Sequence, residues 1–254
     1  MTAGLMEIMA VDGGTLALLS AIAFIAAIVS GMSGMGGGLI VSIFVAPLVG
    51  VEALVPTIGL AMLIAHVARV WVYRRDILWR EAMLVVAVAV PAAVAGSVFY
   101  ASLTSNAIGA VLGLFLIASV PLRRIMQRRA FRLAAPGLMA CSAGYGFISG
   151  TTLGAGLLII PVLMSAGLLG MQLIATDAVI GLSVLVAKTL TYGQFSLLDL
   201  RLTLFGLLIG AWMIPGTYLA GWLVRRTGVR IHTFLMEAII VVGGLSFLWR
   251  AFGG

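Results

Sequence analysis

Charged residues are scarce in this sequence. Only 9% of its 254 residues are Asp, Glu, Lys or Arg, against about 25% in an ordinary soluble domain. Hydrophobic residues make up 63%, and the mean hydropathy is +1.23. So few charges cannot cover a water-exposed surface of normal size, which excludes a soluble globular enzyme as well as disordered and fibrous chains. The composition therefore predicts an integral membrane protein.

Cysteine is nearly absent too. The single Cys141 excludes an internal disulfide and a cysteine-based metal cluster, and we expect no metal site. The sequence lacks the G-x-x-x-x-G-K-[ST] motif and a soluble domain that could hold a nucleotide, so no cofactor is expected. The N-terminus has no basic n-region, only Glu7 and Asp12, so we expect no cleaved signal peptide.

Long apolar runs fill most of the chain. The runs are 14–30, 36–50, 53–73, 82–102, 105–122, 135–150, 153–168, 171–191, 200–223 and 232–252. A helix that crosses the hydrocarbon core needs about 20 residues. The four shorter runs form two consecutive pairs, within 14–50 and 135–168. The sequence leaves open whether each pair crosses twice or folds as a re-entrant hairpin, which gives ten crossings or six crossings with two hairpins.

Basic residues indicate the orientation of the chain. The net charge of +7 is concentrated in short clusters between apolar runs, which is typical of cytoplasmic loops and not of a nucleic-acid-binding surface. The clusters are Arg74, Arg75 and Arg80; Arg123, Arg124, Arg128, Arg129 and Arg132; and Arg225, Arg226 and Arg230. An even number of runs separates each cluster from the next, so all three can lie on the cytoplasmic side. Both termini are then predicted outside.

The two halves of the sequence resemble each other. Residues 36–41 match residues 154–159 at a shift of 118, and Tyr73 matches Tyr192 at a shift one residue longer. The expected units are a first transmembrane repeat (14–122), a basic cytoplasmic linker (123–134) and a second, inverted repeat (135–252). Each repeat has five runs, an odd number, so the second enters the membrane from the opposite side. The predicted fold is an all-α membrane protein with an inverted repeat of five plus five helical segments and Gly-broken half-helices, which is typical of secondary transporters.

Glycine clusters break the helices at matching places, 31–38 and 150–156. Broken backbone at membrane depth survives only where it is buried or lines a cavity. A helix that restarts after a break presents free N–H groups and its positive dipole end to an anion. We predict that one small anion is bound by Ser33, Gly36, Gly37, Gly38, Thr151, Thr152, Gly154 and Gly156, with Thr57 and Thr176 lining the same site. The alternative is that these glycines only permit close helix packing.

Ionisable residues within the apolar runs are functional candidates by default, and four of them are His66, Arg69, Asp177 and Lys188. His66 and Arg69 lie three residues apart on one helix face, and Lys188 lies late in the eighth run. We expect these three to compensate the anion's charge or to couple transport, with His66 as a group that titrates near neutrality. Alternatively, His66 is a buried packing residue and the two cations reach the membrane surfaces. Asp177 is interpreted as a residue at a helix start.

Two other functions would use the same residues. An anion channel could be built on the same inverted scaffold. A rhomboid-like intramembrane serine protease would use Ser33, in Gly31-Met-Ser33-Gly34, with His66 as its base. The histidine follows the serine by too few segments for a rhomboid, and a rhomboid has no such internal repeat. We therefore expect that the chain is not an enzyme.

The glycine clusters and the residues after them resemble the sulfite exporter TauE/SafE family of membrane permeases. The matching residues are Gly34-Met-Gly-Gly-Gly38, Pro47 and Thr57 in the first half, and Gly154-Ala-Gly156, Pro161 and Ala175-Thr176 in the second. The resemblance covers residues 15–252. It implies export of small sulfur-containing anions, such as sulfite, sulfonates or sulfoacetate, across the bacterial inner membrane.

Three features depart from the family pattern. Residues 152–156 replace a fuller glycine run, Asp177 stands where a small hydroxyl residue is usual, and Pro47 lies further from its glycines than Pro161 does. These departures bear on the substrate more than on the fold. The expected partners are a small anionic substrate and the lipid bilayer, with a homodimer left open and nucleic acid not expected.

Overall fold

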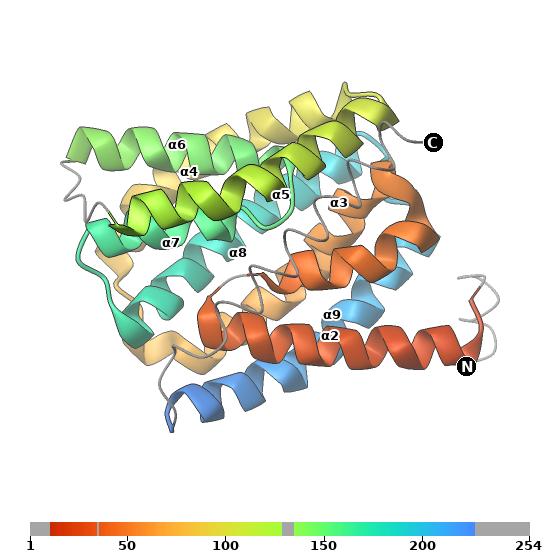
Figure 1. The fold of residues 1–254 in the computed structure, drawn as a ribbon, viewed down its shortest axis with the longest axis horizontal. Helices are drawn as coiled ribbons and strands as arrows, with labels where there is room; N and C mark the ends of the chain where they lie inside the picture. Colours follow the sequence, from red (N-terminus) through yellow and green to blue (C-terminus); the bar gives the residue numbers. More distant parts are fainter. Residues whose placement is uncertain (1–10, 35, 129–134, 227–254) are drawn as a thin grey trace.

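The computed structural model describes residues 11–34, 36–128 and 135–226 (Figure 1). Within these ranges every regular element is a helix, as predicted. The elements are α2 (Gly13–Ser33), α3 (Gly37–Tyr73), the 3-10 helix η1 (Arg74–Asp76), α4 (Trp79–Ala101), α5 (Ser105–Arg128), α6 (Ala135–Thr151), α7 (Gly156–Ser165), α8 (Gly170–Gln194) and α9 (Leu200–Val224). The expected tenth segment, 232–252, and residues 129–134 of the expected linker lie outside the described residues.

Five of the described helices, α2, α3, α4, α8 and α9, are long and apolar enough to cross a membrane. The shortest of them, α2, has 21 residues, or about 31 Å at 1.5 Å per residue, which matches a hydrocarbon core of about 30 Å. Large apolar side chains also point outward from the bundle, such as Leu84 and Trp212, 55% and 46% exposed. Such a surface is stable in lipid and not in water, so the chain is embedded in a membrane.

The helix break predicted at 31–38 is present. α2 ends where Gly34 takes the left-handed conformation (φ 79°) and donates its N–H to the Ser30 carbonyl. α3 begins after Gly36, which is also left-handed (φ 87°). Residues with a Cβ rarely adopt this backbone. Glycine at these two positions therefore lets one helix end and the next begin with almost no connecting loop.

Each half of the chain contains a helix that is too short to cross the membrane alone. In α3, Gly50 has a non-helical backbone (φ 79°, ψ 165°) that separates a first arm, 37–49, from a second arm, 51–73. These arms correspond to the separate runs expected there. The first arm is about 20 Å long. In the second half α7 has 10 residues, or about 15 Å. Both short helices start directly after a glycine break.

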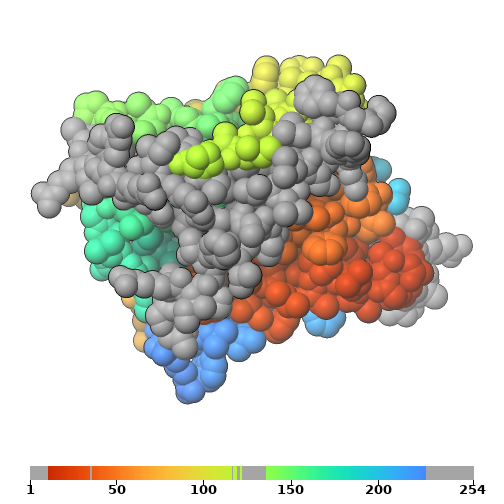
Figure 2. Space-filling model, viewed as in Figure 1, coloured from red at the N-terminus to blue at the C-terminus, as the bar shows by residue number. Residues whose placement is uncertain are grey.

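The two halves pack against each other through their helices (Figure 1). In the space-filling view the red α2 of the first half lies beside the blue α9 of the second (Figure 2). α2 of the first half packs on α9 of the second, and α6 of the second half packs on α4 of the first. Small residues make both contacts close. A Cβ on Gly31 would lie 2.5 Å from Ala220 Cβ, and a Cβ on Gly146 would lie 2.1 Å from the Ala89 carbonyl oxygen. Close contact of this kind is what holds helices together in lipid, where apolar burial gives little driving force.

Equivalent hydrogen bonds occur in the two halves. The Tyr73 hydroxyl donates to the Gly31 carbonyl (3.1 Å) and the Tyr192 hydroxyl donates to the Gly150 carbonyl (2.5 Å); each pair is 42 residues apart. A shift of 119 residues carries the first pair onto the second. Each bond ties the end of a long helix to the helix that precedes the break. The two breaks are therefore held in the same way.

The basic clusters at the ends of α3 and α9 lie at the same end of the bundle. The Arg225 guanidinium donates to the Val72 carbonyl at 3.5 Å, which places two of the clusters together, as the charge pattern predicts. At the opposite end of α4 the Tyr100 hydroxyl donates to the Glu52 carbonyl at 2.8 Å, and the Ser105 hydroxyl donates to the Glu52 carboxylate. The uncharged loop before α5 is thus separated from the arginines by the length of α4.

Candidate functional site

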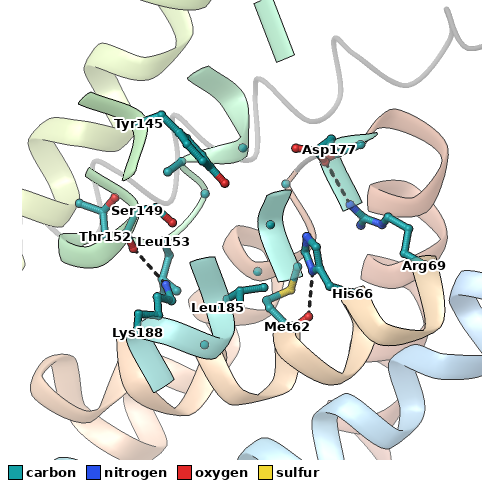
Figure 3. Close-up of a pocket in the computed structure, with 18 residues that line it drawn as sticks. Met62, His66, Arg69, Tyr145, Ser149, Thr152, Leu153, Asp177, Leu185 and Lys188 are labelled. Carbon is teal, nitrogen blue, oxygen red and sulfur yellow. Dashed lines mark hydrogen bonds and ion pairs between the residues drawn. The ribbon is translucent and has the colours of Figure 1, made fainter. Parts of the chain in front are cut away.

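The two helix breaks meet at an internal cavity of about 70 Å³ (Figure 3). Its walls come from the break between α2 and α3, the break between α6 and α7, the second arm of α3, and α8. One water needs roughly 10–15 Å³ of such space, so the cavity can hold several waters or one small ion. Segments from both halves of the chain thus line one chamber.

Two helices begin at this cavity. Gly36 caps α3 and Ala155 caps α7, and both residues line the chamber. The first N–H groups of a helix have no acceptor within the helix, and the dipole places partial positive charge at that end. Neither cap residue has a side chain that bonds these groups, although the Leu157 and Leu158 N–H groups of α7 donate to the Gly154 and Ala155 carbonyls. The cavity therefore offers backbone donors and a positive potential, which favour an anion.

A buried ion pair joins α3 to α8 at the cavity. Arg69 Nη1 lies 3.6 Å from Asp177 Oδ2, and the two side chains are 2% and 3% exposed. Arg69 also donates to the Gly34 carbonyl (3.3 Å) and to the Ser30 hydroxyl (3.1 Å), which fixes it to the end of α2. Its Nε has no hydrogen-bond partner among the described residues. The guanidinium is thus held in place, but not all of its N–H groups have a hydrogen-bond acceptor among the described residues.

Lys188 of α8 is the second buried cation, 3% exposed. Its Nζ donates to the Ser149 carbonyl at 3.1 Å. Within the ranges that the structure describes, no carboxylate lies within 4 Å of it. The cavity is therefore lined by two cations and one carboxylate, and with a neutral His66 these side chains carry one net positive charge. An unpaired buried cation is costly, and a bound anion removes that cost.

His66 of α3 faces the cavity with one ring nitrogen engaged. Its Nδ1 lies 2.8 Å from the Met62 carbonyl oxygen. Since a carbonyl only accepts, Nδ1 carries the hydrogen in the neutral ring. Nε2 lies against α8, where a Cβ on Gly181 would be 2.6 Å away. The neutral imidazole therefore turns its unprotonated nitrogen towards α8, where glycine leaves it room.

Comparison with protein families matches residues 19–247 to the family described as Sulfite exporter TauE/SafE. The chain belongs to this family. The match includes both helix breaks and every residue of the cavity wall, so this TauE/SafE protein is a membrane transporter and not an enzyme. Comparisons with curated proteins and with solved structures find no match.

Five of the ten residues expected to bind the anion or line its site, and all three expected to compensate its charge or couple transport, lie together in this TauE/SafE protein. Those on the cavity wall are Gly36, Gly38, Thr152, Gly154, Gly156, His66, Arg69 and Lys188. The alternative that the two cations reach the membrane surfaces is wrong, because Arg69 and Lys188 are 1% and 3% exposed and bond to the ends of α2 and α6.

Five expected residues lie outside the wall, and the hydroxyls of three of them bond elsewhere. The Ser33 and Thr151 hydroxyls donate to carbonyls of their own helices, those of Val29 and Ile148. Thr176 accepts a hydrogen bond from the Leu78 N–H at 3.1 Å. The remaining two are Gly37, where a Cβ would meet Ser30 Oγ at 2.6 Å, and Thr57, whose fully buried hydroxyl has no partner within the described ranges.

The wall also contains residues that the sequence did not single out for this role. The interpretation of Asp177 as a helix-start residue is wrong: it lies well inside α8 and pairs with Arg69. An ionisable side chain inside an apolar run is itself a functional signal, so Asp177 could have been found. Tyr145 and Ser149, one turn apart on α6, carry no such signal, because hydroxyl residues are common in membrane helices.

The protease alternative has no geometry to support it. His66 bonds to the Met62 carbonyl and packs on Gly181, and it forms no hydrogen bond to Ser33 in the described part of the chain. A serine nucleophile needs a base within hydrogen-bond reach. This agrees with the family, whose members are transporters.

Proposed function

We propose that this protein is a secondary transporter that exports small sulfur-containing anions, such as sulfite, sulfonates or sulfoacetate, and that it binds them in the cavity between the two helix breaks. The observation that carries the proposal is the excess of cations, Arg69 and Lys188 against Asp177, beside two helix N-termini. A sulfur oxyanion has several acceptor oxygens, so it can bond to an ammonium group and to backbone N–H groups at once. The positive charge selects it over neutral solutes.

The burial of the charged side chains at the cavity favours a transporter over an anion channel on the same scaffold. The charged side chains at the cavity are buried, with Lys188 3% and His66 7% exposed. Alternating access in an inverted repeat moves one half against the other around a fixed site. The matching bonds of Tyr73 and Tyr192, and the short helices after both breaks, support such a repeat here.

The proposed setting is the bacterial inner membrane. The basic clusters would face the cytoplasm and both termini the outside, following the rule that loops rich in arginine stay inside. Energy would come from an ion gradient or from the anion's own gradient. The described cavity is formed by one chain, so a homodimer is not needed to complete the site.

Removal of the Lys188 charge tests the proposal. In proteoliposomes we expect the wild-type chain to bind and carry labelled sulfite or methanesulfonate. We expect Lys188→Gln to weaken binding about 10- to 100-fold, because hydrogen bonds to charged groups contribute about 1.5–3 kcal/mol.

Arg201→Gln is the matched control for this experiment. It also removes one positive charge, but Arg201 bonds to the Leu48 carbonyl (3.4 Å) away from the cavity wall. We expect it to bind as the wild type does. Equal losses in both variants would show that the cavity is not the site, and a wild-type chain that binds none of the anions would overturn the proposed function.

A further inference from the structure

The two buried cations have matching surroundings, but only one has a carboxylate partner. Arg69 and Lys188 each donate to the serine 39 residues earlier in the chain, the first to its hydroxyl and the second to its carbonyl. Arg69 also pairs with Asp177 at 3.6 Å. The shift of 119 residues that relates the two cations places Ile58 at the position equivalent to Asp177. Isoleucine cannot neutralise Lys188, so the two halves differ in charge at this point.

We propose that Asp177 is a built-in competitor of the substrate: it holds Arg69 while the cavity is empty, and a proton that binds to Asp177 releases Arg69 to the incoming anion. This inference rests on the proposed anion site. A carboxylate and a sulfur oxyanion make the same charge-assisted hydrogen bonds to a guanidinium, so they compete for the same donors. Leaving a buried cation without an anion is strongly unfavourable. Arg69 therefore exchanges one anion for another, which couples proton binding to substrate binding.

Several elements present polar groups to Asp177. α3 presents Arg69 and His66, and α6 presents Tyr145 from the other side of the cavity (Figure 3). α2 contributes backbone, since a Cβ on Gly34 would lie 3.9 Å from Asp177 Oδ2. α8 itself bears Lys188, further along the cavity wall. Among these groups, Arg69 is the one that forms an ion pair with Asp177 in the described part of the chain.

Other charged groups lie on η1 and the start of α4, which pack against α8. They are Arg74, Arg75, Asp76, Arg80 and Glu81. Leu78, between them, donates its N–H to Thr176, the neighbour of Asp177. Within the described ranges none of these side chains pairs with Asp177, and none of them lines the cavity. The protonation of Asp177 therefore acts first on Arg69.

The sequence suggests His66 as the group that couples transport, but protonation of His66 and protonation of Asp177 change the donors available to the anion differently. Its Nδ1 bonds to the Met62 carbonyl, and it contacts no carboxylate among the described residues. A proton on His66 adds a positive charge but frees no donor. A proton on Asp177 removes a negative charge and frees the Arg69 guanidinium in the same step, so it acts directly on binding.

The proposal makes the charge of the cavity depend on one proton. With Asp177 ionised and His66 neutral, the lining side chains carry one net positive charge; with Asp177 protonated they carry two. A monoanion matches the first state. A dianion matches the second, so its binding brings one proton from solution onto the carboxylate while Arg69 stays charged. Binding of sulfate or thiosulfate should therefore take up more protons than binding of methanesulfonate.

The test uses the full-length chain in lipid nanodiscs, titrated calorimetrically with sulfate, thiosulfate and methanesulfonate at pH 5.5 and pH 8. These probes keep their own charge across that range, unlike sulfite. For the wild type we expect the dianions to bind about 5- to 150-fold more tightly at the lower pH, with proton uptake measured in weak buffer. For Asp177→Asn we expect tight binding at both pH values and no proton uptake.

Two variants serve as controls. Asp199→Asn makes the same chemical change at the N-cap of α9, where the Asp199 carboxylate accepts the Leu202 N–H at 2.7 Å, and asparagine is also a good cap. We expect it to keep the wild-type pH dependence. His66→Gln alters a residue of the cavity wall, so we expect its affinities to change, but we expect the ratio of the affinities at the two pH values to stay that of the wild type. If Asp177→Asn fails to fold, proton uptake by His66→Gln decides the question, because uptake that persists without the histidine must come from another group on the wall, of which Asp177 is the carboxylate.

The outcomes separate this inference from the proposed function. Wild-type binding of the dianions without proton uptake, or an unchanged pH dependence in Asp177→Asn, would overturn the role of Asp177 and leave the anion site intact. Loss of the pH dependence in His66→Gln alone would assign coupling to the histidine and also overturn the inference. If the wild type binds none of the probes and no sulfite at either pH, both proposals fail.

Discussion

Single charged side chains strongly affect the electrostatic energy of the cavity, because most of the residues around them are apolar. Arg69, Asp177 and Lys188 are 1%, 2% and 3% exposed in a chain with 9% charged residues. Hydrogen bonds and charges are stronger in such a low-dielectric environment than in water, and an unpaired group is correspondingly costly. Substitutions of these side chains are expected to change binding, whereas substitutions of the glycines at the breaks change the backbone itself.

Gly154 offers the sharpest test of the backbone at a break. Its φ of +81° and the 2.5 Å between a built Cβ and the Leu39 side chain both oppose alanine. We expect Gly154→Ala to lower the free energy of unfolding by about 1–3 kcal/mol and to weaken anion binding. Unfolding in mixed detergent micelles measures the first effect and calorimetry the second.

The control at this scale is Gly144→Ala, in α6. A Cβ there meets nothing within 4 Å, and alanine favours a helix over glycine by about 1 kcal/mol. We expect equal or slightly higher stability and unchanged binding. If both alanine variants behave alike, the strained backbone at Gly154 has no role in the site.

At the scale of elements, local sequence determines where the helices break, and hydrogen bonds from tyrosines distant in the sequence stabilise the helices before the breaks. The sequence predicted both interruptions and the division of α3, since glycine is the residue that ends helices and allows positive φ. It could not predict which hydroxyls face the cavity. Thr151 lies beside the break, yet its hydroxyl bonds to the preceding turn, as threonine often does in a helix. Which way such a side chain turns depends on its neighbours in space.

The tyrosine bonds to the helices before the breaks can be tested as a pair. Tyr73→Phe and Tyr192→Phe each remove one buried donor, to the Gly31 and Gly150 carbonyls. We expect each variant to lose about 0.5–1.5 kcal/mol of stability, by similar amounts because the two contacts are equivalent. Tyr218→Phe, at a side chain 49% exposed, should change nothing. Unfolding in mixed micelles measures all three, and a loss in one variant only would argue against equivalent roles.

At the scale of the whole molecule, the halves are not separate bodies. The first helix of each half packs on the helix formed by the fourth apolar run of the other half, α2 on α9 and α6 on α4. Each half alone therefore leaves a glycine-lined surface without its partner. The cavity needs both halves, because Arg69 comes from the first and Asp177 from the second.

Splitting the chain tests this interlocking. We expect fragments 1–128 and 129–254, produced together, to purify as one complex in detergent, and each fragment alone to be unstable. Gly146→Leu should prevent assembly, because even a Cβ there would lie 2.1 Å from the Ala89 carbonyl oxygen. Gly144→Leu on the same helix is the control. Stable isolated fragments, or assembly that survives Gly146→Leu, would contradict the prediction.

The composition and the sequence pattern alone determined that this chain is a membrane protein built of helices. They also determined that the helices are interrupted at 31–38 and 150–156, because apolar content and glycine act locally. The spacing of the basic clusters along the sequence was likewise sufficient to predict that the clusters after α3 and after α9 lie at one end of the bundle. The pairing of Arg69 with Asp177, and the lack of such a partner for Lys188 among the described residues, were decided only by the tertiary structure. Partners so distant in sequence meet through helix packing, and no local pattern encodes which charges that packing brings together.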